Sequence, residues 1–122
     1  MQGYERKYLR VNYQKEVELE TESRLKLHAC GENISMGGLG ITCDRITAQE
    51  MMPASYQLNH DPSLRLSVRL TLDNTTLVVS CGIQNNYRLA ENAYSFNLKF
   101  IALKQANLQL LENFIKKQGK TN

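Results

Sequence analysis

The segment from Leu64 to Asp73 constrains the fold more than any other part of the chain. Apolar and polar residues alternate through it without interruption, and every apolar position in it is a leucine or a valine. A repeat of two residues is typical of a β-strand with one buried and one exposed face. This segment is the clearest strand in the sequence, and the pair Asp73-Asn74 predicts that the chain reverses directly after it.

Shorter segments repeat the same pattern. Further strands are predicted at residues 17–20, 25–29, 39–44, 76–83 and 94–100. The aromatic residues Tyr94, Phe96 and Phe100 are expected to fill the core. Residues 84–92 carry three asparagines, an arginine and a glutamate, so they are predicted to be a strand end and an exposed loop. Residues 48–52 predict a helical turn before Pro53.

The periodicity changes near residue 103. Apolar residues then recur at spacings of three and four, which predicts a helix over about residues 103–118, with Gly119 as its stop. About six strands and a final helix predict a mainly β protein, a small six-stranded antiparallel β-barrel with the helix packed across it. The barrel and helix are assigned to residues 15–122. Residues 1–14 are predicted to form a flexible N-terminal arm.

Composition limits the function classes. The 122 residues fit one domain, and the net charge of +3 suits a small anionic ligand better than a nucleic acid polymer. The sequence indicates neither a metal site nor an enzyme. Its three cysteines are widely spaced, and its histidines are His28 and His60. We expect His60 to lie in a surface loop. The sequence lacks a long apolar run and a signal-peptide pattern, so we expect no membrane insertion and a cytoplasmic location.

Two polar motifs offer binding chemistry. The arm holds Arg6, Lys7 and Arg10, and residues 33–38 read Asn-Ile-Ser-Met-Gly-Gly at a corner between two predicted strands. Arginines supply fixed cations, Asn and Ser supply hydrogen-bonding groups, and glycines let the backbone approach a ligand. Taken alone, the first motif favours a solvated basic arm, and a plain turn explains the second about as well.

Together the two motifs resemble those of the PilZ domain family, Arg-x-x-x-Arg followed by (Asp/Asn)-x-Ser-x-x-Gly. Arg6 and Arg10 match the first motif. Asn33, Ser35 and Gly38 match the second. The resemblance implies a small β-barrel that binds the bacterial second messenger cyclic di-GMP and needs no cofactor.

The resemblance also implies roles for these residues. The arginines would bind phosphate oxygens or guanine, so Arg6→Lys should be nearly as harmful as Arg6→Ala. Asn33 would hold a guanine edge, where the family often has Asp. Ser35 would donate its hydroxyl to a phosphate or ribose oxygen. Gly37 and Gly38 would let the backbone close on the ligand.

Other positions are weaker candidates. Lys7 lies between the arginines. Tyr87 and Arg88 are candidates for the large side chain with which family members contact a guanine, although an exposed loop end explains them too. Asn97 stands where the family commonly has a glycine. Glu5 places an anion where a basic residue would help to hold a second nucleotide, so we expect one cyclic di-GMP per chain.

Three functions remain open. Both motifs favour a cyclic di-GMP receptor. Its arm would become ordered when the ligand binds, and this ordering would be the signal to an unidentified downstream protein, for example in motility or biofilm regulation. The alternative is an adaptor of the same fold that binds protein without nucleotide, in pilus or flagellar machinery. Binding of single-stranded nucleic acid would need aromatic residues on an exposed basic sheet face, whereas the phenylalanines are predicted to be buried.

Overall fold

A computed structural model describes residues 9–52 and 64–120. The elements in chain order are β1 (Val11–Thr21), β2 (Lys26–Ile34), β3 (Gly38–Cys43), α2 (Arg45–Met51), β4 (Arg65–Leu72), β5 (Thr75–Ala90), β6 (Ala93–Ile101) and α3 (Gln105–Lys120). The expected loop around His60 lies outside the described residues. No helix in the described ranges is long and apolar enough to cross a bilayer.

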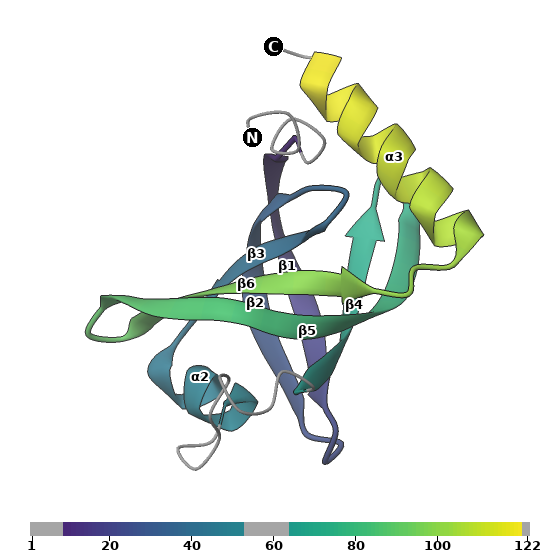
Figure 1. The fold of residues 1–122 in the computed structure, drawn as a ribbon. Helices are drawn as coiled ribbons and strands as arrows, with labels where there is room; N and C mark the ends of the chain where they lie inside the picture. The colour runs from purple at the N-terminus through teal and green to yellow at the C-terminus, as the bar shows by residue number, and fades with distance from the viewer. Residues whose placement is uncertain (1–8, 53–63, 121–122) are drawn as a thin grey trace.

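The six strands close into a barrel in the order β1-β2-β3-β6-β5-β4, and every neighbouring pair is antiparallel (Figure 1). The last strand, β6, therefore lies between β3 and β5. Closure removes sheet edges, which would otherwise pair with other chains. The predicted six-stranded barrel with a C-terminal helix is confirmed.

The barrel interior follows the alternation of the strands. In β4, Leu66, Val68, Leu70 and Leu72 all point inward and are almost fully buried. Of the three aromatic residues in β6 that were expected in the core, only Phe96 is fully buried. Tyr94 and Phe100 pack against the core from partly exposed positions. They lie near the ends of the strand, where the barrel wall gives less cover.

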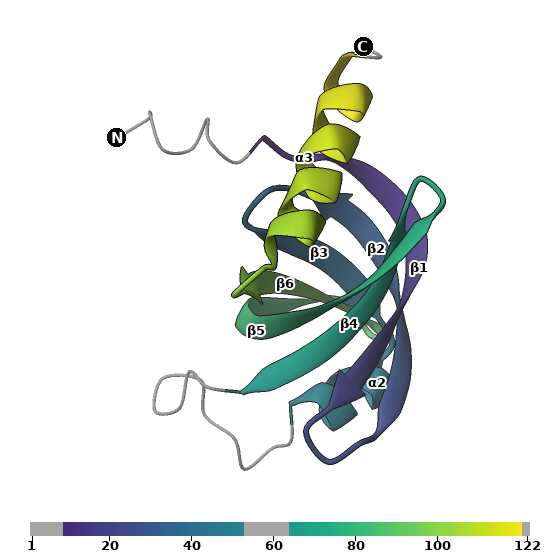
Figure 2. The same ribbon diagram turned by 90° about the vertical axis from the view of Figure 1, so that its right-hand side faces the viewer.

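Helices α2 and α3 lie toward opposite ends of the barrel (Figures 1 and 2). Helix α3 contacts β1 and β4, and it buries Leu111, Phe114 and Ile115. The Phe114 ring meets the Tyr13 ring of β1 edge to face, with centroids 6.1 Å apart. The Tyr13 hydroxyl donates to the Thr71 carbonyl oxygen at 2.7 Å and accepts from the Thr71 amide at 2.9 Å. This tyrosine thus connects β1, β4 and α3.

Several predicted boundaries were wrong. Strand β1 begins at Val11, so residues 11–14 belong to the barrel and not to the arm. Strand β5 continues to Ala90, so residues 84–90 are strand and not loop. All seven of these residues are exposed. They pair with β6 on one side, but the pairing of β5 with β4 ends at Gly82, so no described strand pairs with their other side. A strand segment that is exposed on both faces carries no alternation of apolar and polar residues to reveal it.

The helices also differ slightly from expectation. Helix α2 is longer than the predicted turn at residues 48–52. It begins at Arg45, because the Asp44 carboxylate accepts from the Thr47 amide at 2.8 Å and caps the helix. Helix α3 runs over residues 105–120, two residues later than predicted at each end.

Candidate functional site

The corner between β2 and β3 is built around Ser35. The Ser35 oxygen accepts from the amides of Gly37 at 3.1 Å and Gly38 at 3.2 Å, and the Ser35 amide donates to the Gly38 carbonyl oxygen at 2.9 Å. The residue is only 2% exposed. Ser35 therefore stabilises the turn. Its buried position does not support the predicted hydrogen bond from the Ser35 hydroxyl to a ligand.

The two glycines of the corner face strand β6. A Cβ atom at Gly38 would lie 2.1 Å from the Leu98 carbonyl oxygen, which is backbone and cannot turn away. The Gly37 carbonyl oxygen accepts from the Phe100 amide at 3.0 Å. Gly38 is thus required for the close packing of β3 on β6, whether or not a ligand also approaches it.

The two sequence motifs meet through Arg10 and Asn33. Arg10 directly precedes β1, and its guanidinium donates a hydrogen bond to the Asn33 side-chain oxygen. Arg10 is exposed and makes no ion pair with a carboxylate among the described residues. Arg6 and Lys7 lie outside the described residues, so the first half of the arginine motif stays a prediction.

A row of amide side chains continues from Asn33 across the outer surface of the barrel. Asn33 pairs with Gly40 of β3, Gly40 with Asn97 of β6, and Asn97 with Asn85 of β5. The Asn33 amide lies over Gly40, since a Cβ there would be 2.8 Å from the Asn33 oxygen. The Asn97 amide nitrogen donates to the Asn85 oxygen at 2.7 Å. We call Asn33, Asn97 and Asn85 the amide row.

Sequence reasoning missed Gly40, Asn85 and Lys99. Lys99 is exposed and pairs in register with Gly38, so it adds a cation beside the corner. None of the three belongs to a motif. They join the site through pairing across strands, and a single sequence does not display which residues pair.

Of the two weaker candidates on β5, only Tyr87 lies on the face of the amide row. It follows Asn85 by two residues, it pairs with Ser95, and its side chain is exposed. Arg88 follows Tyr87 by one residue and therefore points to the opposite face of β5. Its guanidinium donates to the carbonyl oxygens of Ala90 at 3.0 Å and Glu91 at 3.4 Å. Tyr87 therefore stays a candidate for contact with a guanine. The Arg88 side chain instead bonds to the backbone at the hairpin tip.

One carboxylate borders the site. The Glu32 carboxylate accepts from the Thr42 hydroxyl at 2.8 Å and from the side-chain amide nitrogen of Gln14 at 3.5 Å. Desolvation by neighbouring atoms and the nearby Glu32 carboxylate raise the pKa of the exposed Cys30 thiol. Within the described residues no three His, Cys, Asp or Glu side chains gather in a possible metal site.

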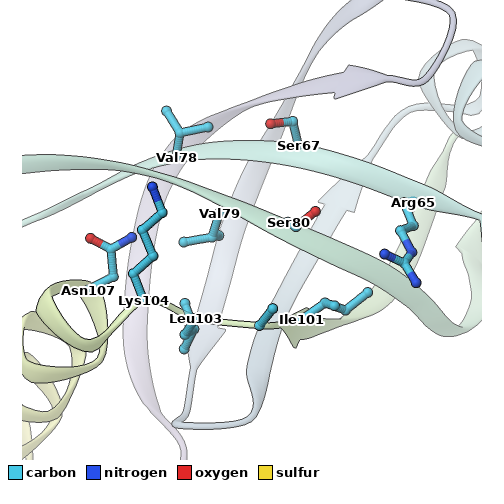
Figure 3. A pocket seen from close by; sticks show the side chains of 10 residues that line it. Arg65, Ser67, Val78, Val79, Ser80, Ile101, Leu103, Lys104 and Asn107 are labelled. Carbon is cyan, nitrogen blue, oxygen red and sulfur yellow. The ribbon is translucent and has the colours of Figure 1, made fainter.

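A pocket of about 330 Å³ lies elsewhere, between β4, β5 and the segment that leads into α3 (Figure 3). Arg65 and Lys104 lie on opposite sides of it, and Val79 and Leu103 are among its apolar lining residues. No residue of the two motifs or of the amide row lines it. The candidate site is therefore distinct from this pocket.

The fold and both sequence motifs can be compared with known protein families. A family model described as the PilZ domain matches residues 4–117. The chain belongs to the PilZ domain family. The matched range covers both motifs, every strand and most of α3, so the resemblance inferred from the motifs is confirmed.

Solved structures share the fold of this PilZ chain. The inhibitor of motility MotI/DgrA from Bacillus subtilis matches with a TM-score of 0.68 and 17% identity, over 93% of this chain and 51% of that one. The PilZ domain of YcgR from Escherichia coli, solved with cyclic di-GMP, matches with a TM-score of 0.67 and 11% identity, over 93% and 91%. PlzA from Borreliella burgdorferi, in complex with cyclic di-GMP, matches with a TM-score of 0.62 and 16% identity, over 99% and 57%.

Identities this low establish a shared fold and nothing finer. This PilZ chain spans about half the length of MotI/DgrA, whose remaining residues have no counterpart in it. A search of curated protein sequences finds no significant match. These comparisons therefore do not identify the ligand, the partner or the process of this chain.

Proposed function

We propose that this PilZ domain is a receptor for cyclic di-GMP, which it binds on the outer surface around Arg10, Asn33 and the β2–β3 corner. The observation that carries the proposal is the hydrogen bond between the Arg10 guanidinium and the Asn33 oxygen. It unites two motifs that lie 23 residues apart in the chain. Family membership and two relatives solved with cyclic di-GMP support this ligand.

The charges at the site suit a ligand with two phosphodiester groups. The Arg10 fork has five N–H donors, so those not bound to Asn33 remain for phosphate oxygens or for guanine O6 and N7. Lys99 supplies a second cation at the corner. In this proposal Arg6 and Lys7 complete the cationic side, and Tyr87 offers an aromatic face to a base.

The domain would act as a binding module and not as an enzyme. One cyclic di-GMP would bind per chain, residues 1–10 would fold over it, and a downstream protein would recognise the ordered arm. Such a receptor would act in the cytoplasm, where the messenger is made, in a process such as motility or biofilm formation.

The alternative is an adaptor that binds protein without nucleotide. The observation that favours it is the likeness to MotI/DgrA, a protein described as an inhibitor of motility. In an adaptor, Arg10 and Lys99 would contact an acidic protein surface.

Isothermal titration of the purified chain with cyclic di-GMP tests the proposal, with GMP and cyclic di-AMP as competing ligands. We expect one site per chain. Arg10→Ala should weaken binding about 10- to 100-fold, because a charge-assisted hydrogen bond contributes about 1.5–3 kcal/mol. Arg10→Lys should bind nearly as poorly, since an ammonium cannot bridge Asn33 and a phosphate. Arg45→Ala removes the same charge at the first residue of α2, toward the other end of the barrel, and should bind like the parent.

Two results would overturn the receptor. A folded parent chain that does not bind cyclic di-GMP would favour the adaptor. Equal weakening by Arg10→Ala and Arg45→Ala would mean that net charge, and not the joined motifs, attracts the ligand. A stoichiometry of two would reject the prediction of one ligand per chain.

A further inference from the structure

The amide row lies on the proposed ligand surface but includes Asn97 and Asn85, which belong to neither motif. It crosses four neighbouring strands, β2, β3, β6 and β5. At a strand spacing of about 4.8 Å, three steps span roughly 14 Å. The Asn33 amide leans over Gly40 toward β6, so the next amide along the row is that of Asn97. A base held near Asn33 is thus within reach of Asn97.

The three amides have different hydrogen-bonding groups left for a ligand. The Asn33 oxygen already accepts from Arg10, so this residue mainly offers its N–H groups. Asn97 donates one N–H to the Asn85 oxygen and keeps its own oxygen free of any described donor. Both N–H groups of the Asn85 side chain lack an acceptor within the part of the chain that the structure describes. The Asn97–Asn85 pair therefore presents a carbonyl oxygen beside N–H donors, and the hydrogen bond between the two amides fixes their orientation.

This pattern complements guanine. The Watson–Crick edge of guanine has two N–H donors, at N1 and N2, next to the O6 acceptor. Adenine has an acceptor at N1 and no amino group at C2, so an amide oxygen facing that position would meet a lone pair. A site that leaves a polar group unpaired with the wrong base discriminates strongly against that base.

The geometry points to the Asn97–Asn85 pair as the element that reads the base of the bound dinucleotide. Asn97 accepts from guanine N1–H or N2–H, and Asn85 holds Asn97 in place and donates toward O6. Arg10 and Lys99 then bind the phosphates, and base selectivity lies on β6 and β5. This inference rests on the proposed function, because it needs cyclic di-GMP on this face.

Competition binding with cyclic di-GMP and cyclic di-AMP tests the pair. Asn97→Ala should weaken cyclic di-GMP binding about five- to tenfold and should not weaken cyclic di-AMP binding, so the preference for guanine falls by at least the same factor. Asn85→Ala should change the preference in the same direction by a smaller factor, because Asn97 keeps its oxygen but loses its support. Asn113→Ala removes a surface asparagine on α3 and should change neither ligand.

Arg10→Ala separates this inference from the proposed function, because it should weaken both dinucleotides through their shared phosphates. Thermal melts of each variant check the fold. Binding by the parent with the guanine preference unchanged in both Asn97→Ala and Asn85→Ala would overturn the base-reading pair and leave the receptor intact. A parent chain that binds no cyclic dinucleotide would overturn both.

Discussion

Replacing Ser35 by alanine tests whether this motif serine acts on the fold or on the ligand. The change removes the oxygen that accepts from the amides of Gly37 and Gly38. The Gly38 contact is buried and the Gly37 contact is partly buried, so little water is available to replace either bond. Each buried N–H without a partner costs about 1–3 kcal/mol, and the partly buried one less. We expect Ser35→Ala to lower the free energy of unfolding by about 2–3 kcal/mol.

Urea denaturation measures this loss directly. With a slope of about 1–3 kcal/mol per molar urea, the midpoint should fall by roughly 1–2 M. Ser23→Ala is the matched control, because its hydroxyl lies in an exposed turn and, among the described residues, bonds only to the Thr21 hydroxyl at 3.0 Å. That variant should change stability by no more than about 0.5 kcal/mol.

The refuting result concerns both stability and binding. Measured well below the midpoint, cyclic di-GMP affinity of Ser35→Ala should fall less than that of Arg10→Ala, because the serine shapes the corner and does not face the ligand. An unchanged urea midpoint combined with lost binding would show that Ser35 contacts the ligand, as its motif alone predicts.

Three further predictions follow from particular contacts. Gly38→Ala should lower stability by more than about 2 kcal/mol in the same urea assay, because its Cβ would meet the Leu98 carbonyl oxygen at 2.1 Å. Tyr13→Phe should lower it by about 1–2 kcal/mol, since both backbone groups of Thr71 lose their partner. Burial raises the pKa of Cys81 from its usual 9.0 to about 12, so the native state holds a proton that the unfolded state releases. Stability should therefore fall as pH rises from about 9 to 12, and less steeply in Cys81→Val.

The barrel was predictable because its strands obey a simple alternation. In β4 every second residue is apolar and buried, so the period of two identifies both the strand and its inner face. The last part of β5 was not predictable in the same way. Residues 84–90 have water on both sides, so no burial pattern distinguishes them from a loop. Alternation reports burial, and it reveals a strand only where the strand has one face to bury.

The site was only half predictable because two β-bulges decide which residues face it. The register of β2 on β3 shifts between Gly31 and Asn33. Gly31 faces inward beneath the Tyr13 ring, and an unbroken alternation would place Asn33 on that same inner side, opposite Leu39. The extra residue instead turns Asn33 outward, opposite Gly40.

A second bulge does the same for Asn85. The register of β5 on β6 shifts between Ile83 and Asn85, and Ile83 is buried in the core. Without the extra residue Asn85 would face inward opposite Phe96, but with it Asn85 faces outward opposite Asn97. Bulges re-aim side chains next to functional sites. Two of them bring amides from separate strands into one row, and this row is the arrangement that the proposed reading of the base requires.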